Sequence, residues 1–409
     1  MLQFPALEKW LWGIKKRHVD DIVDVIHYYW TTRLLILLAL LISAKQWVGK
    51  PIQCWVPKEF SGAWEQYIED YCFVHATYFA PISIGGKLDP QLKEEAAVTY
   101  YQWVPIDLIV RALLFYIPFR LYRNMLWNAG GRVVETIVGV AISATQADNN
   151  TKEYNEKQDR KTYEAKIQRT ADMLYTWVAH QPERQITWST TCYMILKTLN
   201  LINVLLQLWS FAWMFGYDQS WALQAMSSIM EHNERSWAST GMFPRVVFCD
   251  TSIKNLGNVQ SMTTQCVLMI NLYNERIFLS LWLLFGVMSV VSVINYAMTA
   301  YQLFWPSCYV HNSRRLIDRA CFNDDSTGDR HTYYGIEKEW LSKLGKDYTF
   351  TMRLIENHTG EHVAADIHRA VLFKLHNEKR GKFRENLAAA CTVGPIPDKK
   401  PIEVDNYPV

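Results

Sequence analysis

One short stretch of the sequence has the residue types and spacing of a catalytic metal site. His358, Glu361 and His362 match the pattern H-x-x-E-H, in which two histidines hold a zinc ion. That chemistry needs both histidines on one face of a stable helix, and Thr359 and Gly360 between them weaken a helix. The sequence contains no P-loop, no G-x-G-x-x-G, no C-x-x-C and no G-x-S-x-G. We therefore expect a protein that is not an enzyme, with no catalytic residue, no metal and no cofactor.

The eight cysteines form a second set of residues with chemical potential. Two fall within residues 45–101 and two within residues 218–276, in both cases between apolar blocks: Cys54 and Cys72, then Cys249 and Cys266. Pairs of this kind indicate two disulfides in loops that face an oxidising compartment. Four cysteines allow three pairings, and the residues alone do not choose among them.

Four apolar blocks separate the loops that contain these residues. They predict an all-α membrane protein with a four-transmembrane-helix bundle. About 20 apolar residues cross a bilayer. The third block has 20 residues and the fourth has 29, both without a charge, whereas a soluble protein with buried helices rarely has such a run. The blocks are 25–44, 102–119, 193–217 with its charge-free part 198–217, and 277–305.

Charge placement predicts which side each segment occupies. Residues 1–24 have no apolar core of a signal peptide, and basic residues follow the second and fourth blocks, so we expect both termini in the cytoplasm. The 42 basic and 40 acidic residues nearly cancel, which argues against a nucleic-acid partner. Between the spans we expect extracellular loops at 45–101 and 218–276, a helical cytoplasmic loop at 120–192, a cytoplasmic helical region at 306–390 and a disordered tail at 391–409.

Several polar residues interrupt the predicted spans. Asp107 and Arg111 are four residues apart and share a helix face, which favours a self-neutralising pair or a packing contact over an aqueous pathway. A polar stripe in the third span is typical of bonding between helices, with a pore lining as the alternative. Proline in a span predicts a kink. The stripe consists of Asn200, Asn203 and Gln207, and the proline is Pro118.

The second span is preceded by YYQWV, which consists of Tyr100, Tyr101, Gln102, Trp103 and Val104. Aromatic side chains with polar tips settle at the boundary between membrane and water. We interpret the motif as a membrane-interface anchor at the base of the first loop.

This layout resembles the innexins, the gap-junction proteins of invertebrates. YYQWV followed by proline is similar to the family signature that opens the second span. Further similar stretches occur in the family's order: PIQCWVP at 51–57, YCFVHATYF at 71–79, FPRVVFCD at 243–250 and GNVQSMTTQCVLMINLYNERIF at 257–278. The similarity covers roughly residues 18–390 and is weaker in the central loop and the tail.

The resemblance implies a subunit of a gap-junction channel or hemichannel in the plasma membrane. Such proteins form a ring with other innexins, identical or not, with eight subunits expected, around a wide pore for ions and small molecules. Two rings in adjoining cells dock through their outer loops. The resemblance also implies the pairings Cys54–Cys266 and Cys72–Cys249 within a small disulfide-linked extracellular domain, and pore lining by residues 1–24 with the first span. Membrane lipids are further expected partners.

Two alternative functions are compatible with the sequence. A large-pore release channel of the plasma membrane would never dock, and N-glycosylation sequons in the outer loops would favour it, but these loops encode none. A non-conducting membrane scaffold would bind partners through its long cytoplasmic regions and would pass no dye.

Overall fold

The computed structural model describes residues 20–75, 77–80, 89–128, 131–149, 156–179, 188–215, 220–230, 243–255, 257–305, 311–316, 318 and 345–392. Most of the predicted pore segment 1–24 and most of the predicted tail 391–409 lie outside these residues. The chain forms two compact units. Unit 1 is Met1–Arg132 with Trp188–Trp305, and unit 2 is Val133–Thr187 with Pro306–Val409.

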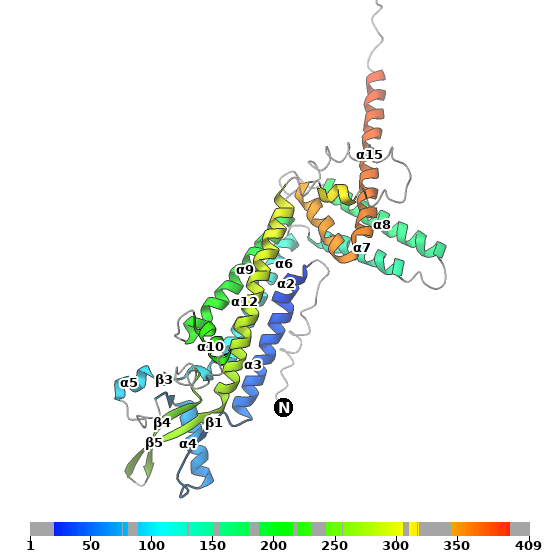
Figure 1. Ribbon diagram of the computed structural model, residues 1–409. Helices are drawn as coiled ribbons and strands as arrows, with labels where there is room; N and C mark the ends of the chain where they lie inside the picture. Colours follow the sequence, from blue (N-terminus) through cyan, green and yellow to red (C-terminus); the bar gives the residue numbers. More distant parts are fainter. Residues whose placement is uncertain are drawn as a thin grey trace, which may run out of the picture. The chain divides into compact units, whose positions relative to one another are not determined.

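Unit 1 is built around long helices that run side by side (Figure 1). The first is continuous over three parts: α2 (Ile22–Val25), the π-helical turn η1 (Ile26–Thr31) and α3 (Thr32–Trp47). The others are α6 (Val104–Asn128), α9 (Trp188–Phe215) and α12 (Met269–Phe304). Within the residues that the structure describes, three helices are long and apolar enough to cross a membrane: Ile22–Trp47, Trp188–Trp213 and Met269–Phe304.

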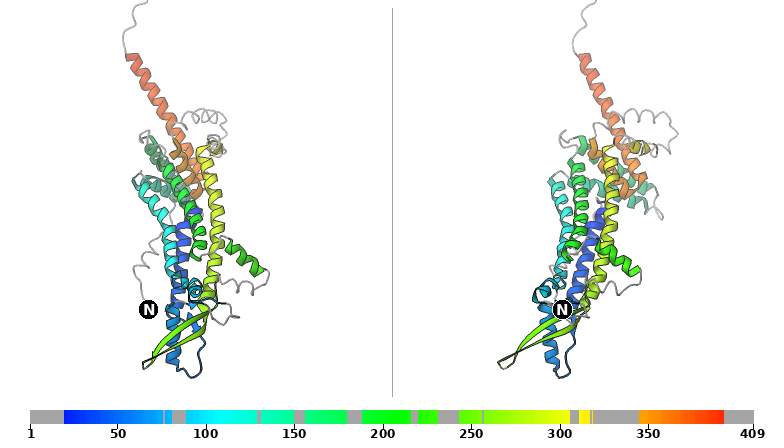
Figure 2. Two further views of the ribbon diagram at one scale, coloured as in Figure 1. Left: turned by 90° about the vertical axis from the view of Figure 1, so that its left-hand side faces the viewer. Right: turned by 60° about the vertical axis from the view of Figure 1, so that its left-hand side comes forward.

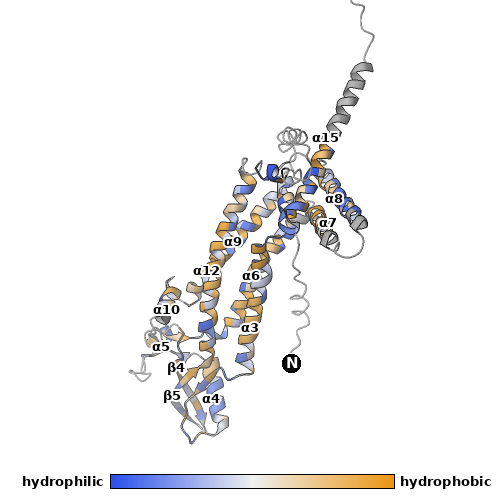
Figure 3. Ribbon diagram, turned by 45° about the vertical axis from the view of Figure 1, so that its right-hand side comes forward, coloured by the Kyte–Doolittle hydropathy of each residue, from blue (hydrophilic) through white to orange (hydrophobic). Residues whose placement is uncertain are grey.

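Apolar residues make up most of these helices, as their hydropathy colouring shows (Figure 3), and they occupy both buried and exposed positions. Leu35 and Phe285 are fully buried, whereas Leu37 and Val290 on the same two helices are more than half exposed. A helix that is apolar on every face is typical of a membrane span, where the outer face contacts lipid. The bundle therefore has the surface of a membrane protein.

A five-stranded antiparallel sheet lies at one end of the bundle in unit 1 (Figure 2). The strand order is β1-β5-β4-β2-β3. The strands, together with the helices α4 (Gly62–Val74) and α5 (Pro90–Glu95), form what we call the sheet domain. The strands are β1 (Ile52–Cys54), β2 (Thr77–Tyr78), β3 (Ala97–Val98), β4 (Val246–Asn255) and β5 (Asn258–Leu268).

The sheet is a departure from the all-α class that the sequence predicts. Its largest part is the hairpin of β4 and β5, paired without interruption from Val246↔Val267 to Asn255↔Asn258. Gly257 has a φ of 99°, which a glycine adopts without strain and which permits the tight turn. Burial alternates along the end of β5, from Thr264 to Leu268, as expected for a strand with one face against a core.

The sheet domain continues into the bundle through short elements. The 3-10 helix η3 (Tyr100–Gln102) leads directly into α6, and β5 leads directly into α12. Helix α12 therefore begins at Met269, eight residues before the predicted fourth span, 277–305. Helix α10 (Trp221–Met230) adds the buried side chain of Trp221 to the core of unit 1.

Unit 2 is helical in its described residues. Helices α7 (Gly131–Asn149, with its first two residues in unit 1), α8 (Glu156–Ala179) and α15 (Glu361–Thr392) are joined by two shorter helices at 311–316 and 345–359. Helix α8 is held to α15 by two contacts. Tyr163 donates to Asp366 at 2.7 Å, and Lys374 lies 2.7 Å from Asp172.

Candidate functional site: buried polar clusters and the disulfide-linked sheet domain

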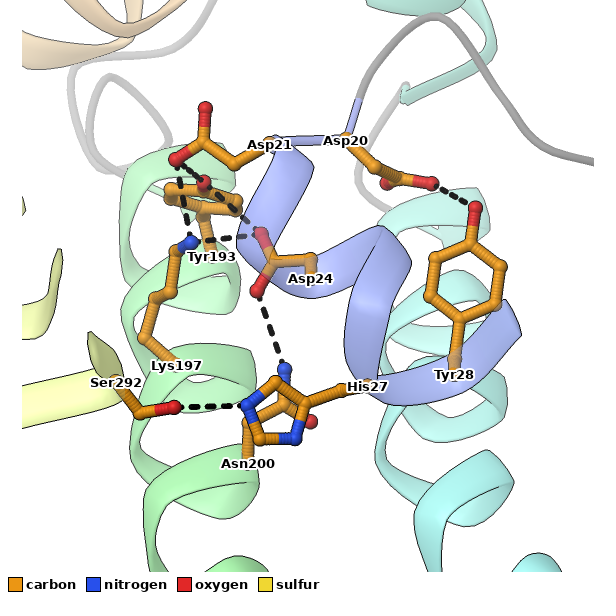
Figure 4. A network of polar contacts seen from close by, with 9 residues as sticks. All are labelled: Asp20, Asp21, Asp24, His27, Tyr28, Tyr193, Lys197, Asn200 and Ser292. Atoms are coloured by element: carbon orange, nitrogen blue, oxygen red, sulfur yellow. Dashed lines mark hydrogen bonds and ion pairs between the residues drawn. The ribbon is translucent and has the colours of Figure 1, made fainter. Parts of the chain in front are cut away.

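An ion-pair cluster joins the start of the first long helix to α9 (Figure 4). The Lys197 Nζ lies 2.7 Å from Asp24 Oδ2 and 3.2 Å from Asp21 Oδ2. The Tyr193 hydroxyl donates to Asp21 at 2.7 Å and to Asp24 at 3.2 Å, and Asn200 Nδ2 donates to Asp24 Oδ1 at 3.1 Å. Lys197 and Asp24 are only 4% and 1% exposed, so each charge depends on the other for its stability.

The π-helical turn η1 follows this cluster directly. Its last residue, Thr31, donates its hydroxyl to the carbonyl of Ile26 at 2.9 Å. His27 Nε2 lies 2.8 Å from the Ser292 hydroxyl on α12, and the Tyr28 ring stacks on Phe119 of α6 with centroids 3.8 Å apart. A π-helical turn is rare and frequently marks a functional position. The first long helix is thus tied to three neighbours within two turns.

Neither the ion-pair cluster nor the contact of His27 with Ser292 was predicted as a site. The cluster joins residues that are up to 176 positions apart, and Ser292 is 265 positions away from His27. A local signal was nevertheless present, because Asp21, Asp24 and Tyr28 recur at helical spacing on one face. Lys197 is also the only charged residue within the predicted third span, 193–217.

Arg111 forms a second buried cluster, between α6 and α9. Its side chain is 3% exposed and its Nε lies 2.6 Å from Asp107 Oδ2. Its Nη1 donates to Gln207 Oε1 at 2.8 Å and to the Ser210 hydroxyl at 2.7 Å, and the guanidinium lies 4.1 Å from the Phe211 ring centroid. Asp107 and Arg111 therefore form both an ion pair on one helix and a packing contact with the next.

The polar stripe of α9 divides between these two clusters. Asn200 binds Asp24 in the first, and Gln207 binds Arg111 in the second. Asn203 lies between them, and its buried Nδ2 has no hydrogen-bond partner among the described residues. Pro118 stands inside α6, which continues through it.

Two disulfides join the loops of the sheet domain. Cys54 on β1 is bonded to Cys266 on β5, and the two residues are direct neighbours across the strands. Cys72 on α4 is bonded to Cys249 on β4. The bonds bridge 212 and 177 positions of sequence, so they fasten the segment after the first long helix to the segment before α12. Each contributes about 2–4 kcal/mol to stability.

The YYQWV motif closes the end of α4. The Tyr101 hydroxyl donates to the Phe73 carbonyl at 3.1 Å, and Gln102 Nε2 donates to Phe73 and Val74 carbonyls at 2.6 and 3.1 Å. The last carbonyls of a helix lack partners within the helix, so these side chains satisfy them. Tyr101 is fully buried and Trp103 is 61% exposed, so the two aromatic residues have different environments.

A salt bridge attaches α5 to the hairpin of β4 and β5. Lys93 Nζ lies 2.6 Å from Asp250 Oδ2, while Tyr78 and Thr263 donate to Asp250 Oδ1 at 3.1 and 2.7 Å. Partial burial raises the pKa of Asp250, but the hydrogen bonds from Lys93 and Thr263 outweigh it, and the net pKa is lowered. Asp250 therefore stays ionised at neutral pH.

The described part of unit 2 includes a buried histidine with two hydroxyl partners. His368 is 1% exposed, its Nδ1 lies 2.6 Å from the Tyr348 hydroxyl, and its Nε2 lies 3.0 Å from the Ser313 hydroxyl. Burial lowers its pKa to about 4, so the ring is neutral at physiological pH. The three residues come from different helices and hold them together.

Neither candidate group for a metal ion has the arrangement that a metal needs. Gly360 has a φ of 89° and separates the helix that ends with His358 and Thr359 from α15, which begins at Glu361. The two histidines of the H-x-x-E-H pattern thus lie on different helices. The sulfurs of Cys54, Cys72 and Cys266 are close together, but each is already part of a disulfide.

Comparison with known proteins decides the family. The family model described as Innexin matches residues 20–375. The chain belongs to the innexin family. It is 31% identical to Innexin-3 of Caenorhabditis elegans over 394 residues, which cover 92% of this chain and 89% of the relative. It is also 31% identical to Innexin unc-9 of the same organism, over 90% of this chain and 95% of the relative.

Membership of the innexin family makes this chain a gap-junction channel protein of the membrane. Innexins are channel proteins rather than enzymes, which agrees with the expectation from the motifs. The matched region 20–375 begins at the ion-pair cluster and includes the whole disulfide-linked sheet domain.

Proposed function

We propose that this innexin forms a wide pore that passes ions and small molecules between adjoining cells. The observation that carries the proposal is the disulfide-linked sheet domain at one end of an apolar helix bundle. Two disulfides join the segment after the first long helix to the segment before α12. A domain of this kind is suited to binding a second ring outside the membrane.

The proposal includes four spans, with both termini in the cytoplasm. Helix α6 has 25 residues and therefore a length of about 37 Å, enough to cross a bilayer core of about 30 Å. Its two charges near the start, Asp107 and Arg111, neutralise each other at 2.6 Å. Pairing and burial lower the cost of carrying these charges into a membrane.

We further propose that eight subunits form a ring. The subunits are identical chains or related innexins, and membrane lipids bind their outer faces. Two rings dock through their sheet domains. Residues 1–24 and the first long helix line the pore. The ion-pair cluster of Asp21, Asp24 and Lys197 supports this arrangement, because it fixes the start of the first helix to α9 just where the pore segment ends.

Paired cells test the proposal. Cells that lack other junctional proteins are made to express this chain and are brought into contact, and junctional current and dye transfer are recorded. Both are expected between paired cells. Dye uptake by single cells without transfer between pairs would identify a release channel that does not dock. Neither current nor dye, with the protein present at the surface, would identify a scaffold.

A further inference from the structure

The hairpin of β4 and β5 leaves one edge of the sheet open. Strand β1 pairs with β5 only at Cys266, Val267 and Leu268, and the Trp55 N–H adds one bond to the Gln265 carbonyl at 2.9 Å. No described strand continues along β5 beyond that point. The part of β5 from Asn258 to Thr264 therefore has a strand on one side only.

The backbone groups that face this open edge can be assigned. Gln265 bonds toward β1, whereas the Leu268 N–H bonds the Arg245 carbonyl beside β4 at 2.8 Å. Successive residues of a strand direct their N–H and C=O groups to alternate sides. Val259, Ser261 and Thr263 therefore direct theirs to the same side as Gln265, along the open edge, where the described residues supply no backbone partner.

A hollow of about 1010 Å³ runs beside this edge. Its lining includes Trp55 and Phe60 after β1, Trp64 of α4, Phe248 of β4, and Met262 and Thr263 of β5. Neighbouring residues of a strand point to opposite faces, so the presence of both Met262 and Thr263 in the lining places part of the hollow along the edge of β5. An added strand would lie about 4.8 Å from β5, on the side of this hollow.

The edge has none of the features by which proteins prevent strands from pairing. The sequence of β5 is NVQSMTTQCVL, without a charge or a proline, and its register with β4 contains no bulge. An open, uncharged edge of this length is a template for another strand. The same neutrality lets the segment face its own copy without repulsion between like charges.

We propose that the open edge of β5 pairs antiparallel with the same edge of a second copy of this chain. The inference rests on the proposed docking of two rings. Identical partners that meet face to face are related by two-fold axes, and a two-fold axis makes edge-to-edge strands antiparallel. The axis passes near Ser261, the middle one of the three edge-facing residues. Ser261 then opposes Ser261 of the partner subunit, and the two sheets become one.

Crosslinking tests this arrangement. Opposed residues of a hydrogen-bonded antiparallel pair have Cα atoms about 5.5 Å apart, within the range that a disulfide bridges. Two cell populations express Ser261→Cys with different tags and are mixed. The expected result is a disulfide-linked dimer that carries both tags. Ser252→Cys is the matched control, since Ser252 is exposed and paired with Ser261 on β4 but faces the other side of the hairpin.

Three crosslinking results would overturn the inference. Ser261→Cys gives no dimer, or it gives only dimers with a single tag, which form within one cell. The third result is a mixed-tag dimer from Ser252→Cys instead of Ser261→Cys. A bond from Ser261→Cys to a different protein would also contradict it. Wild-type cells in the same mixture are tested for junctional current. If they couple while Ser261→Cys gives no mixed dimer, docking stands and the edge pairing is wrong. If they do not couple, the proposed function itself is wrong.

A proline exchange gives an independent readout. Ser261→Pro removes an N–H that faces the open edge of β5, and it breaks no bond between β4 and β5. Ser252→Pro also breaks no bond between β4 and β5, but it removes an N–H on the other side of the hairpin. We expect Ser261→Pro to lose junctional current while single cells keep their dye uptake, and Ser252→Pro to keep both. Normal junctional current from Ser261→Pro would contradict the pairing.

Discussion

The ion-pair cluster at the start of the first long helix should respond strongly to the loss of its lysine. In Lys197→Met, the carboxylates of Asp21 and Asp24 lose their shared cation, and Asp24 is 1% exposed. Removal of one partner from a buried ion pair costs about 3–5 kcal/mol, because the remaining charge is buried without compensation. A change of 1 kcal/mol shifts the Tm of a unit of this size by about 2 °C, so we expect a Tm lower by about 6–10 °C.

The assay is thermal unfolding of the detergent-solubilised protein, followed by the loss of its size-exclusion peak. The double variant Lys197→Met with Asp24→Asn lacks one of the two uncompensated charges. Its Tm should therefore be higher than that of Lys197→Met and recover most of the difference from the wild type. Lys58→Met is the control, because Lys58 is exposed and should leave the Tm unchanged. An unchanged Tm for Lys197→Met, or a double variant no better than the single one, would refute the reasoning.

Three further predictions address other contacts. Arg111→Met should lower the free energy of unfolding by about 2–4 kcal/mol, because the bonds to Asp107, Gln207 and Ser210 are lost. Arg111→Lys should restore only part of this stability, measured as the Tm, because lysine cannot reproduce the planar guanidinium. Full recovery with lysine would contradict the geometry. Protonation of buried His368 should destabilise unit 2. In the folded protein the pKa of His368 is about 4, below the ordinary value of 6.5. The neutral ring therefore contributes up to about 3 kcal/mol to the free energy of unfolding above pH 6.5, and this contribution is lost as the pH falls toward 4. Limited proteolysis of unit 2 across this pH range should show that loss, and His368→Leu should reduce it; an equal pH dependence in both would contradict the assignment. Replacement of Cys72 and Cys249 together by serine should abolish junctional current at normal surface expression. Replacement of the buried Cys192, which forms no disulfide, by alanine should leave the current intact. Normal current without the Cys72–Cys249 bond would show that docking does not require this bond.

The sequence predicted the long helices well because their signal is local. Charge-free runs such as 198–217 and 277–305 have few alternatives to a membrane helix. The spacing of Asp107 and Arg111 also predicted their contact, since residues four apart on a helix are neighbours. The sheet was missed because β1, β2 and β3 have only two or three residues each and form through pairing with distant β4 and β5.

The ion-pair cluster could not be predicted for a related reason. Its bonds connect residues up to 176 positions apart, and a single sequence does not indicate which helices are neighbours in the bundle. The YYQWV motif illustrates the same limit. Its aromatic content indicated a membrane boundary, but the bonds from Tyr101 and Gln102 to the end of α4 depend on how the sheet domain folds back.

Electron microscopy of the purified complex will show whether this innexin forms docked rings. We expect two rings of eight subunits joined through their sheet domains, with helix bundles in two parallel membranes or detergent belts. Single rings whose sheet domains remain free under every condition, or particles without a ring, would contradict this expectation.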